Sequence, residues 1–326
     1  MSLKNRFGWS LSRESLFDSC RKRYFFHYYL SWNGWNNQAE EIRREAFLLK
    51  RLISLPLWRG QLVHYITSKV LQSTRRKGRI PPENRVLEYA EERFEKQFQF
   101  SRQKRYLNIP KKRRGKLNID WLALFDHEYC LDIPARRLET VRAEVRESLR
   151  NLLQSGILQR ASLSETSEWL IEDIDMSEFA QSFYLRGVRI FVKTDFIYRS
   201  PDGVLNIIDW KTFRKPAGKD NGDRDQLGVY GYYAASEMKE PPDNVRLTEV
   251  NLLDSAAEKT FCLNEELVAG SEERIEKGIK KLCSVLTGSD PDRNESASPE
   301  HFPANPGTQC RTCNFKRICR DASGPS

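Results

Sequence analysis

Apolar residues in the first half of the chain recur at the spacing of an α-helix. The first 75 residues are predicted to be largely helical, with Ser10 and Ser12 as possible N-terminal caps and a break at Pro56. A second helix is expected over residues 60–72, and helical periodicity returns over residues 119–163. These segments predict a helical layer that precedes the rest of the fold.

Strand patterns begin at residue 188, where apolar and polar residues alternate in a run that leads directly to Asp195. Residues 200–203, Ser-Pro-Asp-Gly, have the composition of a hairpin turn, and a second strand is expected over 204–210. The elements expected after it are a helix over 225–238, strands over 246–253 and 259–263, and a helix over 265–286. This order predicts an α/β core assembled late in the chain.

The second of these strands carries a carboxylate and an amine two residues apart. Asp209 and Lys211 therefore share one face of the strand, whereas Trp210 points to the other face. The turn before this strand is expected to bring Asp195 alongside. Two carboxylates and a lysine suit phosphodiester hydrolysis, because carboxylates hold Mg²⁺ or Mn²⁺ and the ammonium offsets charge on the phosphate. An isolated Asp-x-Lys pair, however, is usually a surface ion pair.

The charge of the chain favours an anionic partner. Its 54 Lys and Arg exceed its 45 Asp and Glu, for a net charge of +9, and half of residues 101–116 are basic with none acidic. Nucleic acid is the first candidate partner, although many basic proteins only carry a solvated basic surface. No apolar run is long enough to span a membrane and the N-terminus lacks the apolar region of a signal peptide. We therefore expect a cytoplasmic protein without a membrane segment.

Three of the seven cysteines cluster near the C-terminus, as Cys310-x₂-Cys313-x₅-Cys319. Three thiolates are incomplete for a tetrahedral metal site or an iron–sulfur cubane, so a fourth ligand is expected from elsewhere in the chain. The spacing alone leaves four candidates, which are Cys20, Cys130, Cys262 and Cys283. The last two lie in strand and helix patterns where a buried free thiol is ordinary.

An ordered series of motifs resembles the PD-(D/E)XK nuclease superfamily in its RecB-like branch. The series comprises residues 187–195, residues 209–212 (Asp-Trp-Lys-Thr), residues 226–230 (Gln-Leu-Gly-Val-Tyr) and His64 on a helix preceded by Gly60. Each motif is weak by itself, but four in this order are fairly specific. The resemblance implies a restriction-endonuclease-like core, which is a mixed central sheet flanked by helices.

The resemblance also implies a role for each matching residue. His64, Asp195 and Asp209 would bind Mg²⁺ or Mn²⁺ together with the main-chain carbonyl of Trp210. Lys211 would orient the attacking water or stabilise the transition state. Gln226 and Tyr230, four residues apart on one helix face, would contact the DNA backbone or support the site. A packing pair on that helix and a structural histidine are the alternatives for these positions.

A second resemblance concerns the cysteines. Residues 11–26, which contain Cys20, resemble the N-terminal helix of the AddB nuclease domain and of CRISPR-associated RecB-like exonucleases, and residues 302–306 resemble the segment before their C-terminal cysteines. The resemblance implies that Cys20, Cys310, Cys313 and Cys319 hold a four-iron, four-sulfur cluster that clips the two ends of the chain together. A zinc ion at the same cysteines remains the alternative.

Four regions are predicted along the chain. Residues 1–55 form an N-terminal helical region, residues 56–73 and 179–286 the nuclease core, residues 74–178 a helical insertion with a basic loop, and residues 287–326 a tether and cysteine segment.

The predicted function is a Mg²⁺- or Mn²⁺-dependent DNA exonuclease that acts on single-stranded DNA or DNA ends in repair, recombination or antiviral defence. The chain contains no Gly-x₄-Gly-Lys-Ser/Thr motif, so unwinding would require a helicase or another complex partner. A catalytically silent DNA-binding scaffold is the main alternative, and a zinc-binding RNA-processing factor ranks below it.

Overall fold

A computed structural model describes residues 4–109, 120–165, 168–172, 181–214, 221–288 and 294–322 of the chain. Its helices are α1 (Leu11–Ser19), α2 (Arg21–Phe25), η1 (Phe26–Leu30), α3 (Glu41–Leu49), α4 (Leu55–Lys77), α5 (Glu83–Arg102), η2 (Arg105–Asn108), α6 (Phe125–Glu128), α7 (Ala135–Gln154), α8 (Gly156–Ser162), α9 (Asn221–Ser236), η5 (Pro242–Asn244), α10 (Glu265–Cys283), η6 (Pro299–His301), η7 (Thr308–Thr312) and η8 (Arg320–Ala322). Its strands are β1 (Gly8–Trp9), β2 (Trp169–Glu172), β3 (Gln181–Leu185), β4 (Val188–Val192), β5 (Phe196–Arg199), β6 (Leu205–Lys211), β7 (Val245–Asn251) and β8 (Ala257–Cys262). Part of the predicted basic stretch, residues 110–116, lies outside the described residues.

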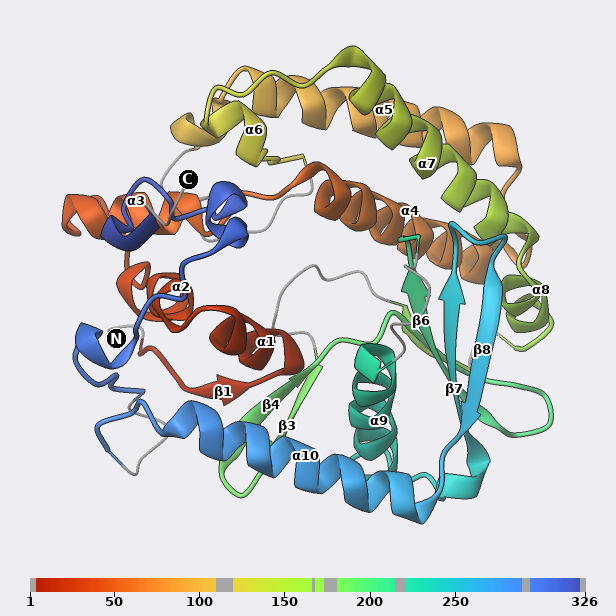
Figure 1. Ribbon diagram of the computed structural model, residues 1–326. Coiled ribbons are helices and arrows are strands. Elements are labelled where there is room, and N and C mark those ends of the chain that lie inside the picture. The colour runs from red at the N-terminus through yellow and green to blue at the C-terminus, as the bar shows by residue number, and fades with distance from the viewer. Residues whose placement is uncertain are drawn as a thin grey trace.

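The strands form two sheets, which are visible in Figure 1. The smaller sheet has the order β1-β4-β3, and the larger has the order β2-β5-β6-β7-β8. In the larger sheet β6 and β7 are parallel, whereas its other neighbouring strands are antiparallel. A mixed sheet with helices on both faces confirms the predicted α/β class and is consistent with a restriction-endonuclease-like fold.

The strand that pairs with β6 is not the one that the alternation predicted. The alternating run ends at Val192 in β4, which belongs to the smaller sheet, and a separate strand, β5, pairs with β6 across the turn. Asp195 precedes β5, next to the register pair Phe196–Ile208, and so stands opposite Asp209. The prediction failed because alternation continues through the junction and cannot show that the chain changes sheets.

The second correction concerns Pro56, which begins a helix instead of breaking one. Helix α4 starts at Leu55, with Pro56 in its first turn, and the Ser54 hydroxyl accepts a hydrogen bond from the Leu57 N–H. Proline is tolerated in the first turn because the N–H groups there have no partner within the helix. The predicted cap at Ser10 is confirmed, since its hydroxyl accepts a hydrogen bond from the Arg13 N–H at the start of α1.

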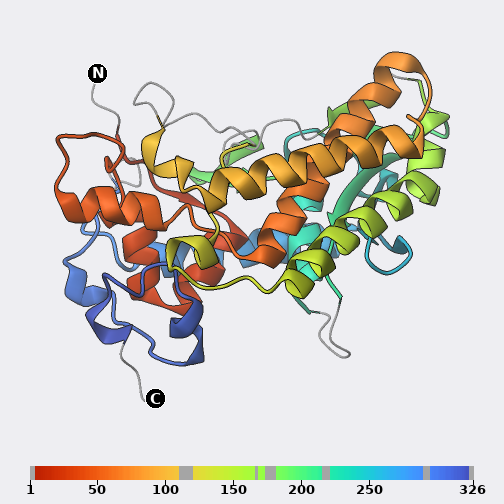
Figure 2. The same ribbon diagram turned by 90° about the horizontal axis from the view of Figure 1, so that it is seen from above.

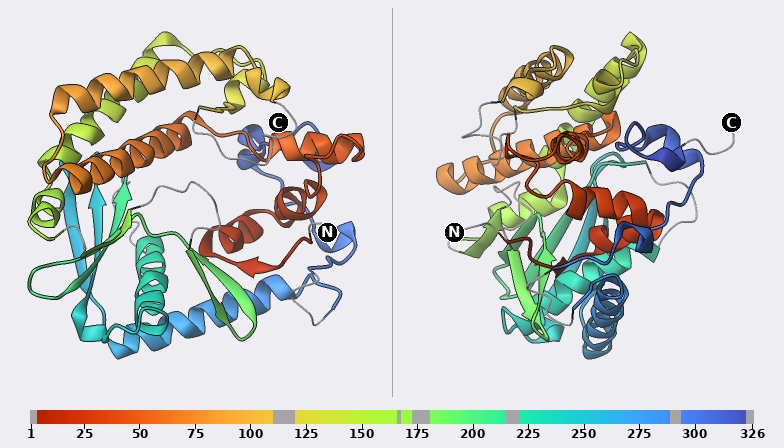
Figure 3. Two further views of the ribbon diagram at one scale, coloured as in Figure 1. Left: turned by 180° about the vertical axis from the view of Figure 1, so that it is seen from behind. Right: turned by 90° about the vertical axis from the view of Figure 1, so that its left-hand side faces the viewer.

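Different helices cover the two faces of the larger sheet (Figures 1 and 3). On one face, Trp58 of α4 and Leu149 of α7 lie in the same core as Ile208 of β6. On the other face, Leu227 of α9 lies in the same core as Ile207 of β6, and α10 contributes to this core as well. Because side chains alternate along β6, Asp209 and Lys211 face α9.

The N- and C-terminal segments meet on one side of the molecule (Figure 2). Phe26 and Phe315 belong to a third core, together with Tyr106 and Phe125 from the region between α5 and α7. The backbone N–H of Lys22 donates to the carbonyl of Pro303 at 3.2 Å. Within the described ranges, no helix combines the length and the apolar character that crossing a membrane requires.

Candidate active site

Asp209 and Lys211 lie at the C-terminal end of β6, where α9 approaches the sheet. The Lys211 Nζ atom is 2.6 Å from the Asp209 Oδ2 atom and donates to the Gln226 Oε1 atom at 2.7 Å. Asp209 is almost fully buried, and the Lys211 side chain is 14% exposed. The predicted carboxylate and ammonium therefore meet, and a residue of α9 holds the ammonium.

Asp195 joins this pair from the junction before β5. Its Oδ2 atom accepts a hydrogen bond from the Trp210 backbone N–H at 2.8 Å, and its Oδ1 atom is 3.0 Å from the Nδ1 atom of His64 on α4. A strand junction, a strand end and a helix on the opposite face of the sheet thus bring three predicted ligand side chains to one place. The Trp210 side chain lies in the core on the opposite face of the sheet, together with Trp58 and Leu149.

Gln226 and Tyr230 support the carboxylates from one face of α9. The Gln226 Nε2 atom donates to the Asp209 Oδ1 atom at 3.2 Å and also to the Tyr230 hydroxyl. The Tyr230 hydroxyl in turn donates to the main-chain carbonyl of Lys193. The sequence did not indicate this carbonyl, since a backbone group has no side-chain signature.

The buried carboxylates have opposite electrostatic environments. Burial, reinforced by the nearby charge of Asp195, raises the pKa of Asp209 to about 6 in spite of Lys211. Burial would raise the pKa of Asp195 as well, but His64, the Trp210 N–H and Lys193 together hold it below its usual value. Two carboxylates buried this close to each other are stabilised by a further cation.

The family to which the chain belongs follows from a comparison with protein families. The sequence matches the PD-(D/E)XK nuclease superfamily over residues 8–320, which is nearly its whole length. The chain belongs to this superfamily. The predicted superfamily is therefore confirmed. Membership implies nuclease activity in general with DNA as the substrate, and nucleases of this superfamily usually use Mg²⁺ or Mn²⁺.

Other comparisons add little about this PD-(D/E)XK nuclease. No curated protein matches the sequence. A solved structure entitled "Crystal structure of SSO0001" shares 16% sequence identity, covers 61% of this chain and 80% of its own, and has a TM-score of 0.29. A likeness at that TM-score carries no argument about function.

The donor groups of this nuclease suit a divalent metal ion. Carboxylate oxygens and an imidazole nitrogen are ligands that divalent metal ions accept, and here the His64 and Asp195 donors are hydrogen-bonded to each other at 3.0 Å. The Oδ2 atom of Asp209 is buried and ion-paired with the Lys211 ammonium at 2.6 Å. The fit to a metal ion therefore rests on the chemistry of the donor set, two buried carboxylates beside an imidazole.

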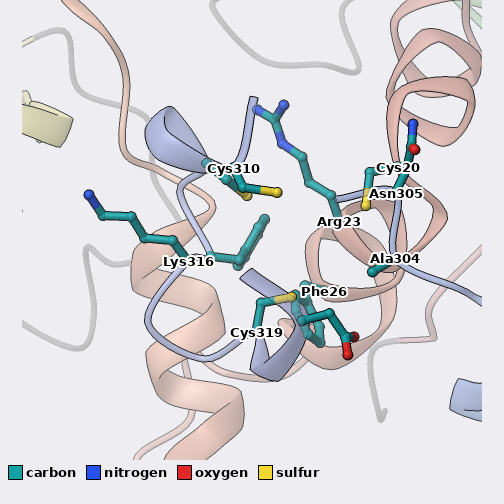
Figure 4. Close-up of a pocket in the computed structure, with 11 residues that line it drawn as sticks. Cys20, Arg23, Phe26, Ala304, Asn305, Cys310, Lys316 and Cys319 are labelled. Carbon is teal, nitrogen blue, oxygen red and sulfur yellow. The ribbon is translucent and has the colours of Figure 1, made fainter. Parts of the chain in front are cut away.

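The four predicted cluster cysteines of the nuclease line one pocket (Figure 4). Its empty volume, part of which is open to solvent, is about 330 Å³, and it is lined by Cys20, Arg23, Phe26, Ala304, Asn305, Cys310, Cys313, Phe315, Lys316, Cys319 and Asp321. Of the four cysteines that the spacing left open, Cys20 alone is among these lining residues. The sequence had not singled out the cations that line the pocket, Arg23 and Lys316.

The cysteine thiols also influence one another electrostatically. Burial raises the pKa of Cys313, and the neighbouring thiols Cys20 and Cys319 raise it further. Within the described ranges, no three or more His, Cys, Asp or Glu side chains are arranged as a metal site, either here or at the carboxylates. At the carboxylates the donor atoms contact each other, Lys211 and Gln226 instead of converging on one point.

Proposed function

We propose that this protein is a metal-dependent deoxyribonuclease of the RecB-like branch, acting as an exonuclease on single-stranded DNA or DNA ends. The observation that carries the proposal is the meeting of His64, Asp195, Asp209 and Lys211 at the end of β6. These side chains come from α4, the β4–β5 junction and β6, and Gln226 on α9 joins them. A silent scaffold would have no need of this buried arrangement of charges.

The residues would divide the work of phosphodiester hydrolysis. His64, Asp195, Asp209 and the Trp210 carbonyl would hold Mg²⁺ or Mn²⁺, which when bound polarises the phosphoryl group and acidifies a water molecule. Lys211 places a positive charge where negative charge develops on the phosphate, or orients the attacking water. Its contacts with Asp209 and Gln226 hold that charge at a defined position.

Gln226 and Tyr230 would keep these groups oriented. Gln226 contacts both Asp209 and Lys211, and the Tyr230 hydroxyl connects Gln226 to the Lys193 carbonyl. Reacting groups held in fixed geometry need less reorganisation in the transition state. The α9 pair thus supports the site in this proposal, and contact with the DNA backbone is its second possible role.

DNA is proposed as the substrate, in repair, recombination or antiviral defence. The net charge of +9 favours a polyanion through counterion release. The sequence has no Gly-x₄-Gly-Lys-Ser/Thr motif, and we therefore propose a helicase or another complex partner for unwinding. We also propose a cytoplasmic location, where cysteines remain reduced and available as ligands.

We further propose a four-iron, four-sulfur cluster at Cys20, Cys310, Cys313 and Cys319, with zinc as the alternative. The shared pocket supports this assignment, and Arg23, which lines it, would offset part of the negative charge of four thiolates. The surrounding backbone also fits a structural role, because the Asn305 side chain donates to the Ser19 carbonyl at 3.1 Å. A cluster here would join the two ends of the chain.

Cleavage assays on defined DNA test the catalytic proposal. Linear and circular DNA, single- and double-stranded, would be incubated with Mg²⁺, Mn²⁺ or a chelator, using the wild type, Asp209→Asn and the exposed control Asp254→Asn. We expect cleavage of linear single strands that requires metal, falls roughly a hundredfold in Asp209→Asn and is unchanged in the control.

Two results would contradict this proposal in different ways. Cleavage of closed circular DNA as fast as linear DNA would refute the exonuclease assignment while leaving the nuclease intact. Absence of metal-dependent cleavage on every DNA would refute the enzyme and favour the scaffold.

A further inference from the structure

The residue after Lys211 is held in place by two consecutive residues of α4. The Arg59 guanidinium donates to the carbonyl of Thr212. At Gly60, an added Cβ atom would lie 3.2 Å from the Thr212 Oγ1 atom, which is closer than most real contacts of that kind. Glycine therefore lets the helix approach the end of β6, and Arg59 fixes the carbonyl that follows the proposed catalytic lysine.

Helix α7 in turn holds Arg59. The Glu144 carboxylate of α7 accepts a hydrogen bond from Arg59, and the two side chains are only 17% and 11% exposed. Glu144 also lies 3.9 Å from Arg214, whose guanidinium pairs at 3.1 Å with Glu147, three residues further along α7. Glu144 therefore holds Arg59, which binds the carbonyl after β6, and Glu147 holds Arg214, which lies three residues beyond β6.

A second contact from α7 reaches the backbone beside Lys211. The Asn151 side chain donates to the Leu252 carbonyl at 2.8 Å, and the Leu252 N–H donates to the Lys211 carbonyl at 2.7 Å. The Asn251 side chain donates to the Phe213 carbonyl at 3.0 Å. The backbone carbonyls of three consecutive residues, 211 to 213, are thus each fixed by a donor from another element.

We infer that α7, acting through Glu144 and Arg59, positions Lys211 for the reaction, and this inference rests on the proposed nuclease function. Figure 1 shows α7 beside α4 over the ends of the catalytic strands. The hydrogen bond from Arg59 to the Thr212 carbonyl restrains the backbone one residue beyond Lys211. A displacement of about 1 Å at a reacting group can lower a rate roughly a hundredfold. Arg59 and Glu144 are positioning residues, because neither contacts the carboxylates or Lys211 itself in the described hydrogen bonds.

The test separates positioning from general stability. Arg59→Gln, Glu144→Gln and the double variant would be compared with Arg142→Gln, which removes a 23% exposed arginine of α7 that pairs with Glu91 on the adjacent helix. The steady-state kcat, the KM for single-stranded DNA and the Tm would be measured for each variant. We expect kcat to fall roughly tenfold to a hundredfold in Arg59→Gln with KM within about twofold, and little change in Arg142→Gln.

The remaining variants keep the inference open to refutation. Glu144→Gln should lower kcat by a smaller factor and should add little in the Arg59→Gln background, because both changes release the same carbonyl. Arg59→Lys, which retains the charge, should recover part of the loss. Wild-type kcat in a folded Arg59→Gln, or an equal loss in Arg142→Gln, would overturn the inference while leaving the nuclease. A wild type without cleavage would overturn both.

Discussion

The buried carboxylate of Glu14 gives a prediction whose size follows from its contacts. Glu14 on α1 is 3% exposed and accepts hydrogen bonds from Trp9 Nε1 at 3.0 Å, Arg274 at 2.8 Å and Lys281 at 2.9 Å. The two cations belong to α10, so Glu14 joins the N-terminal segment to the closing helix. Glu14→Gln keeps the shape of the side chain and removes its charge.

The expected loss is about 2–3 kcal/mol of unfolding free energy. Removing one partner of a buried ion pair costs roughly 3–5 kcal/mol, but Arg274 and Lys281 are 33% and 41% exposed, and this exposure lowers the figure. For a chain of this size, about 2 °C of Tm per kcal/mol gives a decrease of roughly 4–6 °C. The glutamine still accepts the Trp9 N–H, which limits the loss further.

The pH dependence has a definite sign. Burial alone would raise the pKa of Glu14, but Arg274, Lys281 and Trp9 together hold it below its usual value. A depressed pKa in the folded state means that the stabilisation is complete above the unfolded value of about 4.3 and is lost as the pH falls through the folded value. The difference between wild type and Glu14→Gln should therefore be largest near neutral pH and shrink below about pH 4.

Urea denaturation at pH 7, 5 and 4 measures this difference. The matched control is Glu273→Gln, an exposed carboxylate that pairs with Lys277 on the same helix, and we expect it to change stability by less than about 0.5 kcal/mol. The reasoning fails if Glu14→Gln loses no more stability than this control. It also fails if the deficit of Glu14→Gln grows between pH 5 and pH 4.

Three further predictions concern the site and the cysteine region. Tyr230→Phe should lower DNA cleavage roughly tenfold and stability by about 1–2 kcal/mol in kinetic and urea measurements, whereas Tyr184→Phe, at a 60% exposed position, should change neither. Cys313→Ser should lower the iron content and visible absorption of anaerobically purified protein, unlike Cys262→Ser, and a wild type that contains zinc alone would contradict the cluster. Lys316→Ala should cost about 1 kcal/mol in urea denaturation, since the ammonium lies over two aromatic rings at 4.2 and 4.7 Å, and an unchanged midpoint would contradict that contribution.

The meeting of Asp209 and Lys211 at the end of β6 could be predicted from the sequence because one physical rule governs it. Side chains two apart in a strand share a face, and Asp209 and Lys211 do meet beside α9. The approach of His64 and Gln226 could not come from that rule, because nothing in local periodicity relates residues so far apart. His64 and Gln226 were predicted as site residues from the order of the motifs that resemble the superfamily. In the structure both contact the carboxylates.

Other parts of the site were beyond the sequence. Arg59 and Glu144 are 85 residues apart, and their contact depends on how α4 and α7 meet. The helical periodicity predicted over residues 119–163 agrees with α7, whose buried residues include Val145 and Leu149. It could not show that these residues share a core with the catalytic sheet. An amphipathic pattern shows that one side of a helix is covered without showing what covers it.

The cysteines also show which features local spacing predicts and which it cannot. The spacing of Cys310, Cys313 and Cys319 marked three ligands, yet it left the fourth open among four cysteines. The resemblance favoured Cys20, and the pocket contains it beside the other three. Cys20 lies nearly 300 residues before the other three cysteines, and only the tertiary fold brings them together. No local sequence pattern could predict this contact.

The most direct test of the catalytic account is the single-turnover cleavage rate of Lys211→Ala at saturating Mg²⁺ or Mn²⁺. The matched control is Lys277→Ala, which removes an exposed lysine of α10. If the Lys211 ammonium stabilises charge on the phosphate or orients the attacking water, its removal should lower the rate roughly a hundredfold or more, and the control should cleave DNA as the wild type does. Equal rates for Lys211→Ala, Lys277→Ala and the wild type would contradict the account.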